Sequence, residues 1–274
     1  MIKKRLRNIL PPWLRVIRRN CGGYNRNTSL FAGHLSDGGS DEALWAGRLN
    51  ALIFPNGVRK STMSHRNTEI VNGLLNRGEL QWNKEFITVL DMGASAGLDA
   101  LGTLSALEKH IRVSRYVLGD RYTELLFDTR HNRVFDQDGA VIQQLQNNRF
   151  VNLYFEFKYS IEPLFHPWNI LRTRHLRKRL TGVQPDPGHT IRIPLIHPTA
   201  AAHPLMTGCR ADVFQPLTEK YDLIICMNLL QKRYFTEEQV ALGIQNLKEG
   251  LAPGGFLLTG VTDDWQLLSH NQTG

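Results

Sequence analysis

Apolar residues recur along this chain with two periods, one typical of amphipathic helices and one typical of short buried strands. Helical spacing occurs over Asp41–Leu52 and again over Asn67–Leu75. The strand-sized run Phe86–Leu90 is rich in β-branched residues, and a glycine-rich turn separates it from helix-forming residues 98–109. A second strand is predicted at Arg115–Gly119. The first half of the chain therefore predicts two short helices, then a strand, a tight loop, a helix and a strand.

The C-terminal quarter shows the same alternation of strand and helix. Tyr221–Met227 is an almost continuous apolar run, typical of a strand buried on both faces of a parallel sheet. A helix is predicted to begin at Thr236, which forms a capping-box pattern with the Gln three residues later, and to end before the turn at 252–255. A strand follows at Phe256–Thr259, and Trp265–Ser269 offers one more short strand. This order predicts an α/β fold with a mostly parallel sheet and helices on both faces.

Between residues 126 and about 205 the pattern changes, and we expect an insertion after the second strand of the sheet. Arg133–Gln143 predicts a hairpin with an Asp-Gly pair at its tip. Ile170–Leu180 predicts a helix that carries five Lys or Arg and no acid. Its basic side chains form either a solvated face or a patch for an acceptor or a lipid headgroup. We therefore predict one domain over 41–274, interrupted by this insertion.

The net charge of +8 comes from the N-terminus. Residues 1–36 contain eight Lys or Arg and no Asp or Glu, which leaves 25 basic and 25 acidic residues in the rest of the chain. The basic side chains alternate with apolar ones, including Trp13, and Pro11 and Pro12 divide the segment in two. We predict that residues 1–40 form a basic amphipathic arm and linker. The arm either lies on an anionic membrane surface or packs in solvent against the domain.

Composition argues against several other classes of protein. No run of 18 apolar residues is present, so a membrane-spanning helix is not expected. The three cysteines are far apart and form no Cys-x-x-Cys motif, which favours a reducing compartment without disulfides. None of the ten histidines has the paired spacing of a metal site, and we predict no metal. A cytoplasmic protein is expected, with membrane association through the arm as an alternative.

The segment between the first strand and its helix carries the most specific chemistry. From 89 to 100 it reads Val-Leu-Asp-Met-Gly-Ala-Ser-Ala-Gly-Leu-Asp-Ala. Small residues at a sharp turn from strand to helix let the backbone approach a ligand closely. A nucleotide-like ligand is therefore expected at this loop.

This loop resembles the first motif of the class I S-adenosylmethionine-dependent methyltransferases, an acidic residue followed by Gly-x-Gly-x-Gly. Here the motif is Asp91, Gly93, Ser95 and Gly97, so a serine replaces the middle glycine. Later segments resemble further motifs of the family in the same order. They are Asp120 after the second strand, Ala-Asp-Val-Phe at 211–214, and 221–260, which is most similar to the chemoreceptor glutamate methyltransferases.

The resemblance implies a Rossmann-like fold and S-adenosylmethionine as the cofactor. In this family the glycine loop holds the methionine part, the acid after the second strand accepts hydrogen bonds from the ribose hydroxyls, and the acid after the third lies near the adenine. The cofactor-binding residues that this implies are Asp91, Gly93, Ala94, Ser95, Gly97, Asp120, Asp212, Val213 and Asn228.

The acceptor of the methyl group is left open by the sequence, and no catalytic residue is assigned. His65 and Arg66 precede the first strand, where such folds can close over the cofactor, and Tyr234 follows the fourth strand, so these three are substrate candidates. The chemoreceptor enzymes have an Arg before the Asn that follows the fourth strand, whereas this chain has Met227, so their acceptor is not carried over. A small molecule, a glycan or a protein side chain is expected. Nucleic acid is not favoured, because the excess positive charge lies in the arm.

Two other functions remain as alternatives. The first is a scaffold domain that binds the cofactor without turnover, which Ser95 in the motif and the short C-terminal end suggest. The second is a serine hydrolase, because Gly-x-Ser-x-Gly also fits a nucleophile elbow with Ser95 as the nucleophile. Asp263 or Asp264 and then His270 follow in the order that a hydrolase needs, but too few strands precede residue 86 for that fold.

Overall fold

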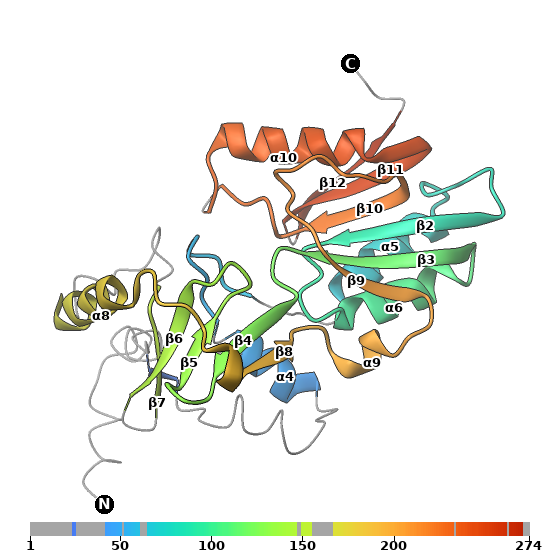
Figure 1. Ribbon diagram of the computed structural model, residues 1–274. Coiled ribbons are helices and arrows are strands. Elements are labelled where there is room, and N and C mark those ends of the chain that lie inside the picture. Colours follow the sequence, from blue (N-terminus) through green and yellow to red (C-terminus); the bar gives the residue numbers. More distant parts are fainter. Residues whose placement is uncertain are drawn as a thin grey trace, which may run out of the picture.

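Two β-sheets form this protein, and they lie side by side (Figure 1). The structure, a computed structural model, describes residues 24–25, 42–50, 52–60, 65–146, 149–154, 167–232, 234–261 and 263–270. Apart from Tyr24 and Asn25, the predicted basic arm and linker lie outside the described residues.

The first sheet has the strand order β12-β11-β10-β2-β3-β9. Five of its strands are parallel, and β12 is antiparallel at one edge. The strands are Phe86–Met92 (β2), Arg112–Asp120 (β3), Met206–Arg210 (β9), Tyr221–Met227 (β10), Leu251–Val261 (β11) and Asp264–Ser269 (β12). The sheet grows outward in both directions from β2, which is the Rossmann-like arrangement predicted from the sequence. From β2 the strand order runs to one side through β3 and β9 and to the other side through β10 and β11. This switch point lies between the parallel strands β2 and β10, so a ligand is expected at their carboxyl ends.

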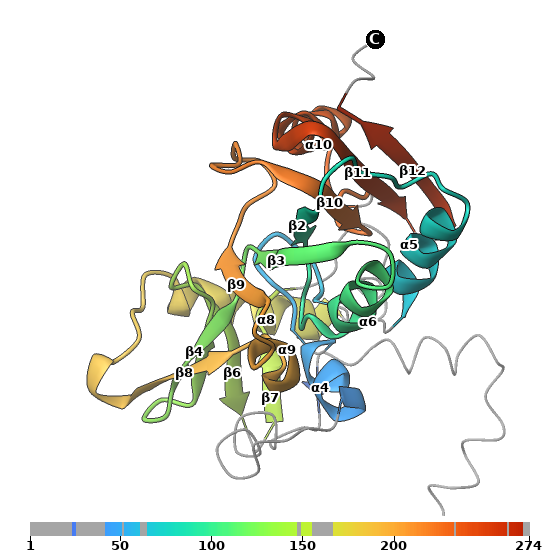
Figure 2. The ribbon, with the colours of Figure 1, turned by 90° about the vertical axis from the view of Figure 1, so that its right-hand side faces the viewer.

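Helices cover both faces of this sheet, as predicted (Figures 1 and 2). Side chains alternate along β2, so Ile87 and Val89 pack toward one face while Leu90 and Met92 pack toward the other. The first face is covered by α5 (Arg66–Asn76), α6 (Leu98–Leu107) and the short α9 (Pro198–Ala201). The opposite face is covered by α10 (Glu237–Glu249), which buries Leu247. The capping box at Thr236, predicted from the sequence, forms at the start of α10.

The insertion supplies five of the six strands of the second sheet. The chain leaves the first sheet after Asp120 and returns to it at Met206. All strands of this second sheet are antiparallel, in the order β1-β7-β6-β5-β4-β8, and β1 is added to the insertion from the N-terminal segment. They are Tyr24–Asn25 (β1), Glu124–Asp128 (β4), Arg133–Phe135 (β5), Val141–Gln146 (β6), Arg149–Asn152 (β7) and Thr190–Pro194 (β8). The predicted hairpin is β5 and β6, and the basic helix is α8 (Pro167–Leu180), which a 3₁₀ turn at Pro187–His189 follows.

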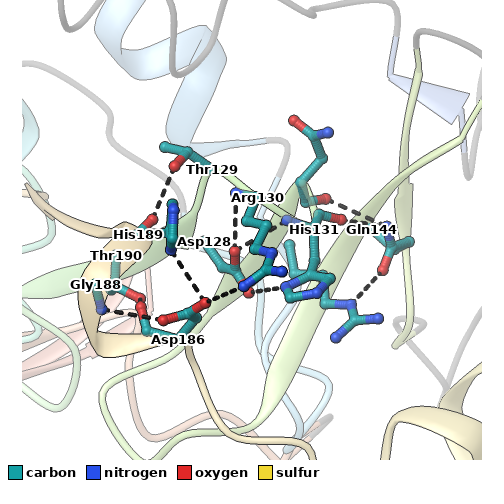
Figure 3. A network of polar contacts seen from close by, with 11 residues as sticks. Asp128, Thr129, Arg130, His131, Gln144, Asp186, Gly188, His189 and Thr190 are labelled. Carbon is teal, nitrogen blue, oxygen red and sulfur yellow. Dashed lines mark hydrogen bonds and ion pairs between the residues drawn. The ribbon is translucent and has the colours of Figure 1, made fainter.

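A network of hydrogen bonds and ion pairs links the turn after β4 to the turn before β8 (Figure 3). Asp128 is buried and accepts a hydrogen bond from the backbone of His131, and its carboxylate lies 2.8 Å from Nδ1 of that residue. Asp186 lies 3.1 Å from Nδ1 of His189 in the same way, and Arg130 reaches Asp186 at 3.4 Å. Each carboxylate therefore closes a tight turn, and the arginine joins the two turns.

One apolar cluster joins the insertion to the loop between β2 and α6. Helix α4 (Glu42–Leu49) and the segment after it contribute Trp45 and Phe54, the insertion contributes Leu125 and Ile193, and the glycine-rich loop contributes Ala96. All five side chains are buried. Since the loop that is expected to bind a ligand packs into this cluster through Ala96, the insertion helps to hold the loop in place. Within the described residues, no helix is long and apolar enough to cross a membrane.

Candidate functional site

A pocket opens at the carboxyl ends of β2, β3, β9 and β10, where the strand order reverses. Each of these strands is followed by a loop that lines the pocket, and the segment before α5 closes another side. Of the residues predicted to bind the cofactor, eight line this pocket: Asp91, Gly93, Ala94, Ser95, Asp120, Asp212, Val213 and Asn228. The fold therefore brings together residues that are as far apart in the sequence as 91 and 228.

The glycine-rich loop turns sharply after β2 and leads into α6. Gly93 has φ +83°, and a Cβ atom at this position would lie 3.3 Å from the side chain of Leu229. Gly93 therefore keeps the backbone in a left-handed conformation and keeps space open at the pocket. Gly97 also has a positive φ, +74°, but its missing Cβ would lie 2.8 Å from Leu118 and 3.1 Å from Ala200. Gly97 thus serves packing behind the loop, and it does not line the pocket.

Asp91 places a buried carboxylate at the end of β2. It is 4% exposed, and the hydroxyl of Tyr116 donates a hydrogen bond to its Oδ2 at 3.3 Å. Burial raises the pKa of Asp91 to about 7, and the negative charges of Asp99 and Asp120 add to the shift. A cationic group that enters the pocket, such as an ammonium, would therefore stabilise the ionised form of this carboxylate.

Asp120 ends β3 and is held by three donors. The backbone N–H of Ser95 donates to Oδ2 at 3.0 Å, and the N–H of Tyr122 donates to Oδ1 at 3.1 Å. The third donor is the ammonium of Lys60, 2.7 Å from Oδ1. The lysine also donates to the carbonyl oxygen of Tyr122 at 2.6 Å. Burial lowers the pKa of Lys60, and the neighbouring Asp120 acts in the opposite direction.

Asp212 stands on the loop after β9 and forms the far end of the pocket. Its Oδ1 accepts from the N–H of Phe214 at 3.1 Å, and its Oδ2 pairs with Arg121 at 3.3 Å. The buried amide of Asn246 in α10 donates to the carbonyl oxygen of Val213 at 3.1 Å, which fixes the same loop from the other side. A fixed carboxylate beside apolar Val213 and Phe214 suits a flat ring that carries an amino group.

The N-terminus of α5 presents Arg66 and Asn67 to the pocket. Among the described residues, Nε of Arg66 is buried and has no hydrogen-bond partner. The helix is capped from α6, because Asp99 accepts from the N–H of Asn67 at 2.9 Å and from the Thr68 hydroxyl at 3.1 Å. His65 is the N-cap residue of α5, with φ 72° and no capping hydrogen bond from its side chain. His65 is exposed and does not line the pocket.

The loop after β10 supplies the remaining predicted residues. Asn228 has φ 59°, and its N–H donates to the carbonyl oxygen of Gly260 at 2.7 Å. Tyr234 lines the pocket next to Phe235, with 6.4 Å between the two ring centroids. Phe235 in turn contacts Phe214 edge to face. These aromatic rings form an apolar wall of the pocket next to the carboxyl end of β10.

The arrangement that a serine hydrolase needs is not present at Ser95. Asp264 and His270 belong to β12 and its end, and two strands separate β12 from β2. At about 4.8 Å per strand this places them more than 10 Å from the loop. The N–H of His270 donates to Gly255, at the amino end of the sheet, whereas Ser95 lies at the carboxyl end. Within the described part of the chain, no group of three or more His, Cys, Asp or Glu could hold a metal ion.

Many residues that line this pocket are not predicted from the sequence, and Lys60, Phe54 and Tyr122 are among them. Lys60 comes from the segment before α5, and the ring of Phe54 stacks on Tyr122 at 4.1 Å between centroids. Lys60 and Asp120 are 60 positions apart, and no local pattern links them. Of the two residues, only Asp120 is predicted from the sequence, because it resembles the acidic residue of the methyltransferase motif after the second strand.

No family model and no curated protein sequence matches this chain. Among solved structures it is similar to the CMeT domain of the citrinin polyketide synthase, with 15% identity over 70% of this chain and 34% of that chain and a TM-score of 0.33. It is similar to the N-methyltransferase NodS from Bradyrhizobium japonicum in complex with S-adenosylhomocysteine, with 15% identity over 71% of this chain and 58% of that one, TM-score 0.32. An O-methyltransferase family protein from Burkholderia thailandensis matches with 11% identity, coverages of 70% and 36%, and a TM-score of 0.32. The chain thus spans between a third and three fifths of the length of these proteins. Its function is inferred from the strand order and the pocket.

Proposed function

We propose that this chain is an S-adenosylmethionine-dependent methyltransferase that uses the pocket at the carboxyl ends of the parallel strands. One observation carries the proposal. Loops after four strands converge at the switch point, and the loops at the ends of the neighbouring strands β2, β3 and β9 supply Asp91, Asp120 and Asp212 in that order across the sheet. This is the order in which the cofactor would present its ammonium, ribose and adenine groups.

The chemistry of the donors fits this cofactor. The buried carboxylate of Asp91 would be stabilised by an ammonium, and Nε of Arg66, which has no partner among the described residues, suits a carboxylate. Asp120 suits sugar hydroxyls, and Asp212 suits an exocyclic amine. Gly93 allows the ligand to pass close to the backbone, at a position where a Cβ atom would already lie 3.3 Å from Leu229. All these groups line one continuous pocket.

Bound S-adenosylmethionine supplies a methyl group that its sulfonium makes electrophilic. Because the transfer is a direct displacement, the residues of this chain have to align an acceptor and exclude water. Asn228, Tyr234 and Phe235 lie at the strand end where the acceptor would enter, and no general base is assigned to them. The acceptor is proposed to be a small molecule, a glycan or a protein side chain. The similarity to the chemoreceptor glutamate methyltransferases stays a prediction.

Calorimetric titration with S-adenosylmethionine and S-adenosylhomocysteine tests the proposal. We expect saturable binding by the wild type, and binding at least tenfold weaker in Asp91→Ala and in Asp120→Ala, because each loses a contact to a charged or polar group. Asp186→Ala is the matched control, since its carboxylate closes a turn of the insertion away from the pocket. A folded wild-type chain that binds neither compound would contradict the proposal.

Turnover separates the enzyme from the scaffold alternative. An enzyme releases S-adenosylhomocysteine when an acceptor is added, whereas a scaffold binds the same cofactor without releasing the product. Methyl transfer from radiolabelled cofactor into small-molecule, glycan and protein fractions distinguishes the two. Binding without transfer into any fraction would support the scaffold.

A further inference from the structure

We propose that Lys60 and Asp120 recognise the ribose of the ligand as a pair, the lysine donating a hydrogen bond to one hydroxyl and the carboxylate accepting one from the other. This inference rests on the proposed function and names the group that determines recognition of the sugar. It differs from recognition by the carboxylate alone, which is what the resemblance implies.

Lys60 reaches the pocket from a turn of the chain before α5. The segment 52–60 folds back on itself, with an antiparallel bridge between Ile53 and Arg59 and a hydrogen bond from the Phe54 N–H to Val58. Buried Phe54 anchors this turn by stacking on Tyr122. Lys60 follows directly, and its side chain is 5% exposed. A turn of the chain thus delivers one ammonium to the wall of the pocket.

The carboxylate of Asp120 is the acceptor of the pair. A carboxylate offers about four acceptor positions on its two oxygens. Among the residues that the structure describes, three of them are used, through Lys60 and Tyr122 on Oδ1 and through Ser95 on Oδ2. One position on Oδ2 is left for a ligand. A ribose presents two neighbouring hydroxyls, so this carboxylate is one acceptor short of holding both.

The ammonium of Lys60 is the donor of the pair. An ammonium has three N–H groups. Within the described residues two of them have acceptors, Oδ1 of Asp120 and the carbonyl oxygen of Tyr122. The third N–H belongs to a residue that lines the pocket. A buried donor without an acceptor is unfavourable, and the oxygen of a sugar hydroxyl would satisfy it.

The pair therefore presents one donor and one acceptor to two adjacent hydroxyls. Each hydroxyl can donate and accept, so a vicinal diol can satisfy both members at once. A deoxyribose lacks one of the two groups, and it would leave either the lysine or the aspartate incompletely paired. Loss of a hydrogen bond to a charged group weakens binding by about tenfold or more.

The experiment is calorimetric titration with S-adenosylhomocysteine and with its 2′-deoxy and 3′-deoxy analogues. In the wild type we expect each analogue to bind about tenfold more weakly than the parent compound. We expect Lys60→Met to bind S-adenosylhomocysteine about tenfold more weakly than the wild type does. In this variant the analogue that lacks the hydroxyl facing Lys60 should bind as tightly as S-adenosylhomocysteine, whereas the other analogue should still bind about tenfold more weakly than S-adenosylhomocysteine. Lys60→Arg retains a donor and should restore part of the discrimination.

Lys84→Met is the matched control. Lys84 also pairs with an aspartate, Asp222, but at the amino ends of the strands and away from the pocket. This variant should bind all three compounds as the wild type does. If Lys60→Met keeps both deoxy penalties, the lysine only supports the fold and the inference is wrong. If the wild type does not bind S-adenosylhomocysteine at all, the proposed function itself fails.

A measurement on the wild type covers the case in which Lys60→Met does not fold. The ammonium of a buried lysine gives a proton–nitrogen NMR signal, which the Lys60→Arg variant assigns by its disappearance. We expect this signal to shift on addition of S-adenosylhomocysteine and to shift much less with one of the two deoxy analogues. Equal shifts with all three compounds would overturn the inference.

Discussion

At the scale of single residues, Asp91 ties ligand binding to pH. Its raised pKa, about 7, means that it is mostly protonated at pH 6 and mostly ionised at pH 8. Only the ionised form attracts an ammonium. We therefore expect S-adenosylhomocysteine to bind roughly tenfold more tightly at pH 8 than at pH 6. Calorimetric titration across this range measures the effect.

The control for this prediction is Asp91→Asn, which should bind weakly with little pH dependence. The same substitution that weakens binding should stabilise the fold at high pH. The pKa of Asp91 in the folded protein lies above its ordinary value of 3.8, so ionisation of the buried carboxylate lowers the free energy of unfolding. This loss develops as the pH rises from about 4 to 7. Removing the carboxylate should stabilise the fold above pH 7 by roughly 2–4 kcal/mol and have no effect below pH 4. A pH-independent effect of Asp91→Asn on unfolding would contradict this account.

The two glycines with positive φ in the same loop should respond differently to a methyl group. Gly97→Ala adds a Cβ 2.8 Å from Leu118 in a left-handed conformation, so it should lower stability by about 2–4 kcal/mol. Gly93→Ala meets only the flexible Leu229 at 3.3 Å, and it should cost about 1–2 kcal/mol. Gly93→Ala narrows the pocket and should also weaken binding of S-adenosylhomocysteine, whereas folded Gly97→Ala should not. Urea unfolding and titration of both variants decide between these outcomes.

At the scale of elements, two helices next to the pocket are capped in different ways. Helix α10 is capped by its own Thr236, which accepts from the N–H of Gln239 at 3.3 Å. Helix α5 is capped by Asp99 of α6. We expect Thr236→Ala and Asp99→Ala each to cost about 1 kcal/mol, because both leave helix donors without a partner. Asp99→Asn keeps an acceptor and should recover most of the loss in denaturant unfolding. If it recovers nothing, the carboxylate does not act as a cap.

The same contrast shows how far the sequence predicts this structure. Thr236 and Tyr221–Met227 were predicted because their signals are local, a capping pattern and an apolar run. Asp99 and Lys60 were not, because each acts on a segment more than 30 positions away. The edge strand β9 was also not delineated, since Met206–Arg210 contains polar residues and Gly208 and lacks an apolar run. Among the predicted site residues, Gly97 and His65 stand outside the pocket lining.

At the scale of the whole molecule, the two sheets should unfold together. The insertion packs into the cluster that contains Trp45, Phe54 and Leu125, and the first sheet is connected to this cluster through Ala96 of the ligand loop and Leu98 of α6. A shared core couples the stability of both parts. A substitution in the insertion is therefore expected to weaken protection of the first sheet, including its central strand β10.

Leu125→Ala tests this coupling from the insertion side. The side chain is fully buried in the shared cluster, so its truncation should cost about 2–5 kcal/mol. Native-state hydrogen exchange should then show the same loss of protection in β5 of the insertion and in β10 of the first sheet. Leu242→Ala on α10, where the side chain is 46% exposed, should change little. If β5 loses protection while β10 keeps it, the sheets unfold separately, and the insertion does not support the ligand loop.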